Sequence, residues 1–225
     1  ENNEIWKYIS SLFPSDDKSS ICYCIKEISL DKDQDSRLAR VAKFYNIATS
    51  ENKEKKYRGA VPLFLAVTNR DVIAVGQLTD VHVDVNQVTY DDVTPLHIAC
   101  QMGHNDMVKM LLKAGADVDK ARYDDTAPLY TITPLYIACE NGHKDVVEML
   151  LLHGADPSKD ITKNGVTPLF ISCEQGHKDV VELLLGRGVD ADKARYDGVT
   201  PLFIACQEGH TDIVKMLLDK IADVD

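Results

Sequence analysis

Apolar and polar positions follow one pattern that recurs along most of the chain. Four 19-residue segments align without gaps, and they begin at Thr94, Thr133, Thr167 and Thr200. In the first, TPLHIACQMGHNDMVKMLL, apolar residues follow Thr-Pro, polar residues surround Gly-His, and a second apolar set recurs at helical spacing. The pattern predicts two amphipathic helices per segment. Their apolar faces need neighbouring segments to cover them, which indicates a stacked solenoid.

Start and stop signals mark the ends of these helices. Thr94 supplies a side-chain oxygen for an N-cap, and Pro95 at the first helical position loses no needed hydrogen bond. Gly103 ends the first helix because glycine accepts a left-handed conformation at little cost. Asp106 stands in the first turn of the second helix, where acidic groups are favoured, and Gly115 ends that helix.

The spacing of the segments gives the repeat length. Their starts are 39, 34 and 33 residues apart, and a degraded fifth copy, VPLFLAV, places Pro62 33 residues before Pro95. TPLH-I-A, Gly-His, VV-x-LL and GAD at this period resemble the ankyrin repeat. Over residues 57–225 the resemblance implies an all-α solenoid of about five helix-turn-helix units with β-hairpin fingers. The units start near residues 57, 90, 123, 163 and 196. The resemblance also implies protein binding through fingers and inner helices, with no catalytic residues.

Several positions depart from that family pattern. The family's histidine after Thr-Pro-Leu is present as His97, so a Thr–His hydrogen bond is expected in that unit. Aromatic packing is expected to replace it at Phe64, Tyr136, Phe170 and Phe203. In the last unit Ile221 stands where the other units have glycine. The chain is therefore expected to be a fragment of a longer array or an array capped in an unfamiliar way.

The 39-residue interval contains two copies of a unit's start, in the sequence RYDDTAPLYTITPLY. Pro128 keeps the 33-residue spacing, but Pro134 is followed by the proper continuation, so the second copy is expected to open the helix. Residues 124–132 are predicted to form a lengthened finger or loop. Its projecting side chains are expected to be Leu129, Tyr130 and Ile132. A duplication tolerated in a surface loop and an extension that contacts a partner are the two interpretations.

Cysteine and histidine recur four residues apart in four units, at Cys100/His104, Cys139/His143, Cys173/His177 and Cys206/His210. Such a pair on one helix would supply half a zinc site. A glycine interrupts the helix between them, and the resemblance implies a small buried residue and a structural histidine, so we expect no metal and no cofactor. All six cysteines, including Cys22 and Cys24, are expected to be reduced thiols that pack inside the protein. Such thiols indicate the cytoplasm, or alternatively the nucleus.

Exposed positions that vary between units form the predicted partner-binding surface. They are the finger tips before each Thr-Pro and the residue pair before each Gly-His. Tyrosine recurs at the tips and gives large contact area at low entropic cost, although packing on the neighbouring finger is an equal alternative. The full predicted set is Tyr57, Arg58, Tyr90, Asp91, Val93, Gln101, Met102, Tyr123, Asp124, Leu129, Tyr130, Ile132, Glu140, Asn141, Asn164, Glu174, Gln175, Tyr196, Asp197, Gln207 and Glu208.

The net charge of −11 falls within the repeats. Residues 57–225 carry 15 Lys and Arg against 26 Asp and Glu, whereas residues 1–56 carry ten of each. This balance argues against nucleic acid, which needs a basic face, and favours a protein partner with a basic segment. No apolar run reaches membrane-spanning length, and no nucleotide-binding or hydrolase motif occurs. We therefore expect a monomeric protein that is not an enzyme and does not bind membranes.

Residues 1–56 do not match the repeat. An apolar stripe at helical spacing runs from Ile5 to Phe13 and stops at Pro14, and RLARVAKFYNIA from Arg37 is another helical pattern. This region is interpreted as a helical cap on the stack or, alternatively, a separate adaptor module. The expected function of the chain is non-catalytic protein recognition. The alternative is a regulatory or targeting segment of a larger enzyme, channel or effector.

Overall fold

The structure is a computed structural model, and it describes residues 61–80, 83–88, 92–124, 127–159 and 164–222. The chain divides into two units, Glu1–Lys53 and Glu54–Asp225, and every described residue belongs to the second. The predictions made for residues 1–56 lie outside the described residues.

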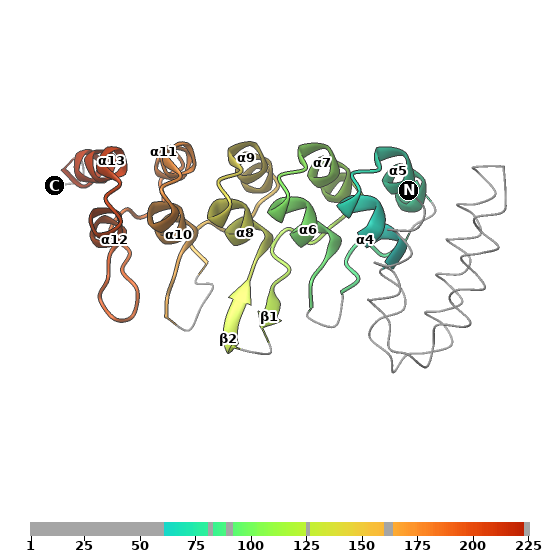
Figure 1. Cartoon of the computed structure of the whole chain (residues 1–225), viewed down its shortest axis with the longest axis horizontal. Helices are drawn as coiled ribbons and strands as arrows, with labels where there is room; N and C mark the ends of the chain where they lie inside the picture. Colours follow the sequence, from blue (N-terminus) through green and yellow to red (C-terminus); the bar gives the residue numbers. More distant parts are fainter. Residues whose placement is uncertain (1–60, 81–82, 89–91, 125–126, 160–163, 223–225) are drawn as a thin grey trace. The chain divides into compact units, whose positions relative to one another are not determined.

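Five helix pairs follow one another through the described residues. The first helices of the pairs are α4 (Val61–Thr68), α6 (Pro95–Gln101), α8 (Pro134–Glu140), α10 (Pro168–Gln175) and α12 (Pro201–Gln207). The second helices are α5 (Val72–Asp80), α7 (Asn105–Lys113), α9 (Lys144–Leu152), α11 (Lys178–Gly186) and α13 (Thr211–Ala222). Figure 1 shows the first helices in one row, here called the inner helices, and the second helices in a row beside them. Each helix packs on its own partner and on its equivalents in the adjoining pairs, which confirms the predicted helical solenoid.

Threonine caps four of the inner helices, α6, α8, α10 and α12. The side-chain oxygens of Thr94, Thr133, Thr167 and Thr200 accept backbone N–H groups three residues further on, at 3.1 to 3.3 Å. Each cap satisfies a donor that the first helical turn leaves unpaired. Proline follows each of these threonines at the start of the helix.

His97 adds a second set of hydrogen bonds to the first of these caps. The backbone N–H of Thr94 donates to Nδ1 of His97 (3.1 Å), and Nε2 of His97 donates to the carbonyl oxygen of Ile132 (3.1 Å). His97 is 1% exposed, and burial lowers its pKa to about 4, with Arg122 lowering it further and the bond to Ile132 opposing the shift. The imidazole is therefore neutral and joins its own helix start to the finger of the following unit.

Equivalent apolar side chains from successive units form a continuous core. In the middle units, the leucine that follows the helix-starting proline is buried, and so is the valine pair of the second helix. These buried residues are Leu96, Leu135, Leu169, Val146, Val147, Val180 and Val181. Cys100, Cys139 and Cys173 are buried as expected, and burial raises the pKa of the Cys139 and Cys173 thiols to about 12. The expectation of burial is wrong for Cys206, which is exposed because no described helix packs beyond α12 and α13.

The six-residue insertion lies in a β-hairpin. Strand β1 (Arg122–Asp124) pairs antiparallel with β2 (Ala127–Ile132), and the register shifts between Tyr123 and Asp124. In Figure 1 this hairpin points away from the helices on the same side as the other fingers. Helix α8 begins at Pro134, so the second copy of the start motif opens the helix and the first copy lies in β2.

Candidate partner-binding surface

The end of each inner helix carries a pair of side chains that face solvent. We call these pairs the inner-helix ends: Gln101–Met102, Glu140–Asn141, Glu174–Gln175 and Gln207–Glu208. All of them are exposed except Glu174, which is half-buried. Because the same positions recur in four successive units, the pairs form a row along the array.

Histidines of the following units fix the backbone of this row. Nε2 of His143 donates to the carbonyl oxygen of Gln101 (3.0 Å), and Nε2 of His177 does the same to Glu140 (2.8 Å). His210 repeats the contact on the carbonyl of Glu174 at 3.0 Å. Three of the four inner-helix ends are thus held in place by a backbone carbonyl.

The glycine before each histidine makes this contact possible. A Cβ built on Gly142 would lie 2.5 Å from Nδ1 of His177, and Gly142 has a φ of +71°. Gly103 and Gly176 hold the rings of His143 and His210 in the same way. The histidines therefore pack on the preceding unit instead of turning towards a cysteine, and no metal-ligating cluster occurs among the described residues.

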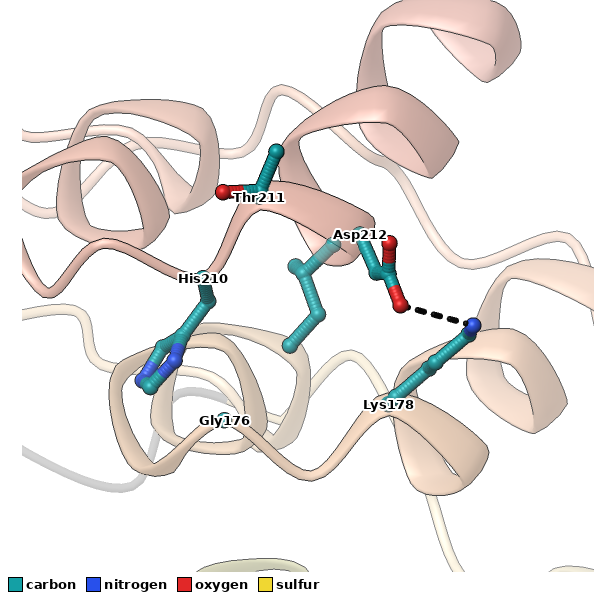
Figure 2. Close-up of a pocket in the computed structure, with 6 residues that line it drawn as sticks. Gly176, Lys178, His210, Thr211 and Asp212 are labelled. Carbon is teal, nitrogen blue, oxygen red and sulfur yellow. Dashed lines mark hydrogen bonds and ion pairs between the residues drawn. The ribbon is translucent and has the colours of Figure 1, made fainter.

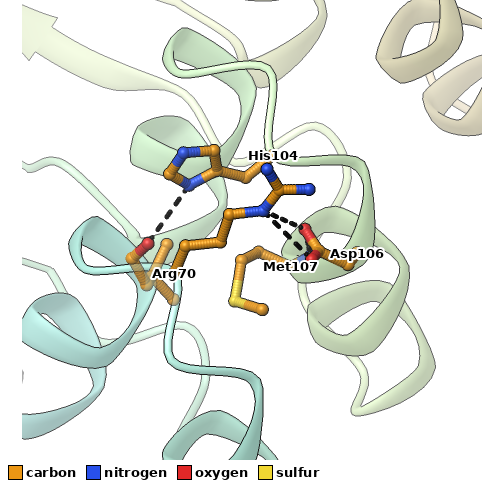
Figure 3. A network of polar contacts seen from close by, with 5 residues as sticks. Arg70, His104, Asp106 and Met107 are labelled. Atoms are coloured by element: carbon orange, nitrogen blue, oxygen red, sulfur yellow. Dashed lines mark hydrogen bonds and ion pairs between the residues drawn. The ribbon is translucent and has the colours of Figure 1, made fainter.

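The first joint between described units has a different set of contacts, drawn in Figure 3. Nδ1 of His104 donates to the carbonyl of Val67 (3.3 Å), and Nε of Arg70 donates to both carboxylate oxygens of Asp106 at 3.1 and 3.2 Å. Desolvation raises the pKa of Asp106, but the bonds from Arg70 and from the backbone outweigh it and lower that pKa overall. Arg70 stands in the position of the glycines and has a positive φ of 53°.

The last joint contains an open hollow of about 400 Å³ beside the helix starts of α11 and α13. Figure 2 shows Lys178 reaching Asp212 across this hollow, with Nζ and Oδ2 3.0 Å apart. The Lys178 hydrogen bond lowers the pKa of Asp212, and Asp212 raises the pKa of Lys178. Both side chains are well exposed, so this ion pair contributes little to stability.

Acidic side chains of neighbouring units influence one another along the inner-helix ends. Partial burial raises the pKa of the Glu140 carboxyl, and the charge of Glu174 raises it further. Arg122 and a hydrogen bond from Tyr136 oppose that shift. Two carboxylates that repel each other are better stabilised by an added cation, which is a property of a surface that accepts basic groups.

In the finger of the fifth unit, Tyr196 both packs on the preceding finger and faces solvent. The Tyr196 ring lies against Gly165 of the preceding finger, where an added Cβ would be 3.0 Å from ring carbons, and the Tyr196 N–H donates to the Asn164 carbonyl (2.8 Å). Even so, 71% of Tyr196 is exposed. Tyr196 therefore packs on its neighbour and still presents most of its ring to solvent, together with the exposed Asn164 and Asp197.

Other predicted contact residues fall into three groups. Val93 is buried in the core because it precedes the capping threonine on the inward side, so it is not available to a partner. Ile132 is half-buried at the base of β2, where its carbonyl accepts the His97 bond. Tyr57, Arg58, Tyr90 and Asp91 lie outside the described residues, and Tyr123, Asp124, Leu129 and Tyr130 are described only as backbone in β1 and β2.

Two arginines that sequence reasoning passed over lie beside this surface. Arg195 stacks over the Phe170 ring, 5.2 Å from its centroid, and is paired with Asp197. Arg122 precedes Tyr123 as Arg195 precedes Tyr196, and its Nε is buried without a hydrogen-bond partner. The repeated sequence KARYD was the available signal, because it occurs in two fingers.

The chain matches the family described as ankyrin repeats (3 copies) over three overlapping segments, residues 37–122, 63–161 and 135–225. Because these segments cover most of the chain, the chain belongs to the ankyrin-repeat family, as the sequence motifs indicated. Ankyrin repeats serve protein–protein interaction and are typically non-catalytic. The first matched segment begins at residue 37, before the boundary at 57 expected from the sequence.

A relative of known name is similar over part of the chain. A 72-residue stretch, 32% of the chain, is 38% identical to Alpha-latrocrustotoxin-Lt1a of Latrodectus tredecimguttatus. That stretch covers 5% of the toxin, so the chain corresponds to a small part of this relative's length. Among the described residues, no helix combines the length and apolar character that crossing a bilayer requires.

Proposed function

We propose that this chain recognises a protein partner through the inner-helix ends and the finger tips, and that the partner presents a basic segment. The observation that carries the proposal is the row of solvent-facing inner-helix ends in four units, three of which have a backbone carbonyl fixed by a histidine. A fixed backbone with exposed, variable side chains is the arrangement expected of a preorganised binding surface. The mutual repulsion of Glu140 and Glu174 supports a cationic partner.

The proposal is tested by charge reversal at two matched positions. Glu174 lies on the inner-helix ends, whereas Glu182 is exposed on α11 in the same unit. A partner is first captured with the full chain and identified by mass spectrometry, and its Kd is then measured for the full chain, Glu174→Lys and Glu182→Lys. We expect Glu174→Lys to weaken binding roughly tenfold and Glu182→Lys to change it by less than about twofold.

Equal loss in both variants would mean that overall charge, and not this row, governs binding. No loss in either would remove the inner-helix ends from the proposed surface. Circular dichroism of both variants is the control for folding, since neither position belongs to the core.

A second candidate function has one observation in its favour. The similarity to a short part of a much longer toxin supports the chain being a regulatory or targeting segment of a larger effector. An antibody raised against residues 57–225 tests this in the native cell. Under this candidate function, the antibody is expected to detect a protein far heavier than 25.0 kDa. Detection of a protein of about 25 kDa and of none heavier would contradict it.

A further inference from the structure

Two fingers carry the same sequence, KARYD, but their arginines are held differently. In the fifth unit, Nε of Arg195 donates to Oδ1 of Asp197 (3.1 Å), and the guanidinium stacks over the Phe170 ring, 5.2 Å from its centroid. Arg122 begins β1 in the third unit, and its Nε is buried without a hydrogen-bond partner. Because a buried donor that is left unpaired is unfavourable, Arg122 is held less tightly in its finger than Arg195.

The six-residue insertion explains this difference. The fifth finger turns tightly, and the Arg195 N–H donates to the Val199 carbonyl (2.9 Å) across the turn. This turn brings the carboxylate of Asp197 beside the arginine. In the third finger two strands replace the tight turn, and Asp124 lies opposite Ala127 in them. The arginine Nε that has an acceptor in the fifth finger therefore has none in the third.

Arg122 stands at the base of its finger, where its charge acts on the inner-helix end of the same unit. Ile132 lies opposite Arg122 in the hairpin, and its carbonyl accepts the His97 N–H (3.1 Å), which fixes the finger base on the preceding unit. Burial is the main cause of the raised pKa of Glu140, and the charge of Arg122 opposes that shift. The charge of Glu174 acts on Glu140 in the other direction. Arg122 is thus a cation beside an acidic pair of the inner-helix ends.

We propose that Arg122 is an internal cation of the inner-helix ends, and that a basic segment of the partner competes with it for Glu140. This inference rests on the proposed function, because it concerns the same acidic surface. The competition sets specificity, since only a segment whose cation binds Glu140 better than Arg122 does displaces the guanidinium. An acceptor for the displaced guanidinium stands two residues further on, at Asp124, which is the spacing between Arg195 and Asp197.

The other use that a partner could make of Arg122 is a direct contact with a carboxylate. The burial of Nε opposes this use, because a partner reaches only the outer end of the guanidinium. Glu140 and Glu174 would also repel an incoming carboxylate. The charges around Arg122 therefore favour an approaching cation, which takes the place of Arg122 instead of binding to it.

Titration of Glu140 tests the internal contact without any partner. The pKa of its carboxyl is measured by NMR in the full chain, in Arg122→Gln and in Arg122→Lys, which keeps the positive charge. We expect this pKa to rise in Arg122→Gln and to stay close to its original value in Arg122→Lys, because the positive charge is what lowers it. If the pKa of Glu140 does not rise in Arg122→Gln, the inference is overturned while the proposed function stands.

Competition is measured with a fluorescein-labelled peptide of nine arginines as the basic segment. Fluorescence anisotropy gives its Kd for the full chain, for the two Arg122 variants and for Lys109→Gln. Lys109 is exposed on α7, one of the second helices, and its loss changes the net charge as Arg122→Gln does. We expect Arg122→Gln to bind the peptide about fivefold more tightly, and the other two variants to differ from the full chain by less than about twofold.

Each other result counts against the inference. Equal tightening in Lys109→Gln would make net charge the cause, and equal tightening in Arg122→Lys would make a disturbed finger the cause. Unchanged or weaker binding by Arg122→Gln would show that Arg122 does not compete. If the peptide bound none of these proteins, the proposed basic partner would be overturned, and the competition with it, even if Glu140 titrated as expected. Circular dichroism checks folding, and Arg122→Met, which keeps an apolar stem, replaces Arg122→Gln if that variant is unfolded.

Discussion

At the scale of single residues, His97 shows how one buried side chain joins two units. Its Nδ1 accepts from Thr94 and its Nε2 donates to Ile132, so both ring nitrogens are satisfied only in the neutral form. Protonation would add a second N–H that faces the Thr94 donor. The lowered pKa of about 4 is the thermodynamic expression of that geometry and of burial.

Stability is therefore expected to fall in mild acid through His97. The unfolded state gains a proton near the ordinary pKa of 6.5, while the folded state resists protonation until about pH 4. The contribution is present in full above pH 6.5 and is lost as the pH falls towards 4, by roughly 3 kcal/mol. Urea unfolding at pH 7 and pH 4.5 measures the stability of the chain and of its His97→Phe variant. Phenylalanine is chosen because Phe170 occupies the equivalent position in a later unit.

The variant is expected to be about 1 kcal/mol less stable at pH 7, because it loses the hydrogen bonds of both ring nitrogens, but to lose less stability in acid. If His97→Phe lost as much stability between pH 7 and pH 4.5 as the unmodified chain, other groups would be the cause of the acid sensitivity. The half-buried histidines after each Gly-His glycine are common to both proteins, so their contribution to the acid sensitivity cancels in the comparison.

Two glycines with left-handed backbones, Gly142 and Gly154, allow a second test. Both have left-handed φ values, +71° and +90°, but only Gly142 has a histidine ring within reach of an added Cβ. Gly154→Ala is expected to cost about 1–2 kcal/mol through backbone strain alone. Gly142→Ala should cost an additional 1–3 kcal/mol, roughly, because the ring of His177 must move. If urea unfolding gave equal losses of stability for the two variants, close packing of the His177 ring on Gly142 would be contradicted.

At the scale of elements, the inner helices were largely predictable because their signals are local. Thr94 sets the helix start through a hydrogen bond within four residues, Pro95 through its fixed φ, and Gly103 sets the helix end through its own backbone. The hairpin of the insertion was not specified in that way, since TAPLYTI also reads as a second helix start. Its strands depend on pairing across the finger, and the His97 contact with Ile132 bridges 35 residues.

The candidate surface was less predictable than the fold for a related reason. The row of inner-helix ends followed from register alone, since each pair precedes Gly-His. Val93 was misjudged because burial depends on which way the backbone turns before the cap, and Cys206 because it depends on what packs beyond its own unit. Arg122 was missed because its signal is the repetition of KARYD in two fingers and not a property of the arginine alone.

The β1–β2 finger gives a prediction at this scale. Removing Thr126–Thr131 leaves RYDDITPLY, which restores a 33-residue unit and keeps Ile132 for His97. Because the deletion shortens a surface connection, we expect stability to change by less than about 1 kcal/mol. Thermal unfolding and far-ultraviolet circular dichroism measure this.

The same deletion separates the two interpretations of the insertion. Undiminished affinity for the identified partner would mark it as a tolerated duplication, whereas weaker binding with intact stability would mark it as a contacting extension. A deletion that unfolds the protein would contradict the view of β1 and β2 as an outlying finger.

At the scale of the whole repeat array, charge and packing act over different ranges. Each described unit packs on its immediate neighbours, so stability is built from successive joints. Charge instead accumulates: residues 57–225 hold the entire net charge of −11. An acidic array of this kind attracts a cationic partner before any contact forms, which affects the association rate above all.

Salt is therefore expected to slow association with a basic partner. Raising the salt concentration from 0.01 M to 1 M shortens the Debye length from about 30 Å to about 3 Å, which removes long-range attraction but leaves close contacts. Stopped-flow or surface-plasmon measurements should find the association rate falling at least roughly tenfold, with a much smaller change in dissociation. Glu182→Lys should reduce the association rate slightly, since it alters total charge, and Glu174→Lys should also speed dissociation, since it alters a contact. An association rate independent of salt would mean that shape and apolar contact, and not the acidic balance of the repeats, select the partner.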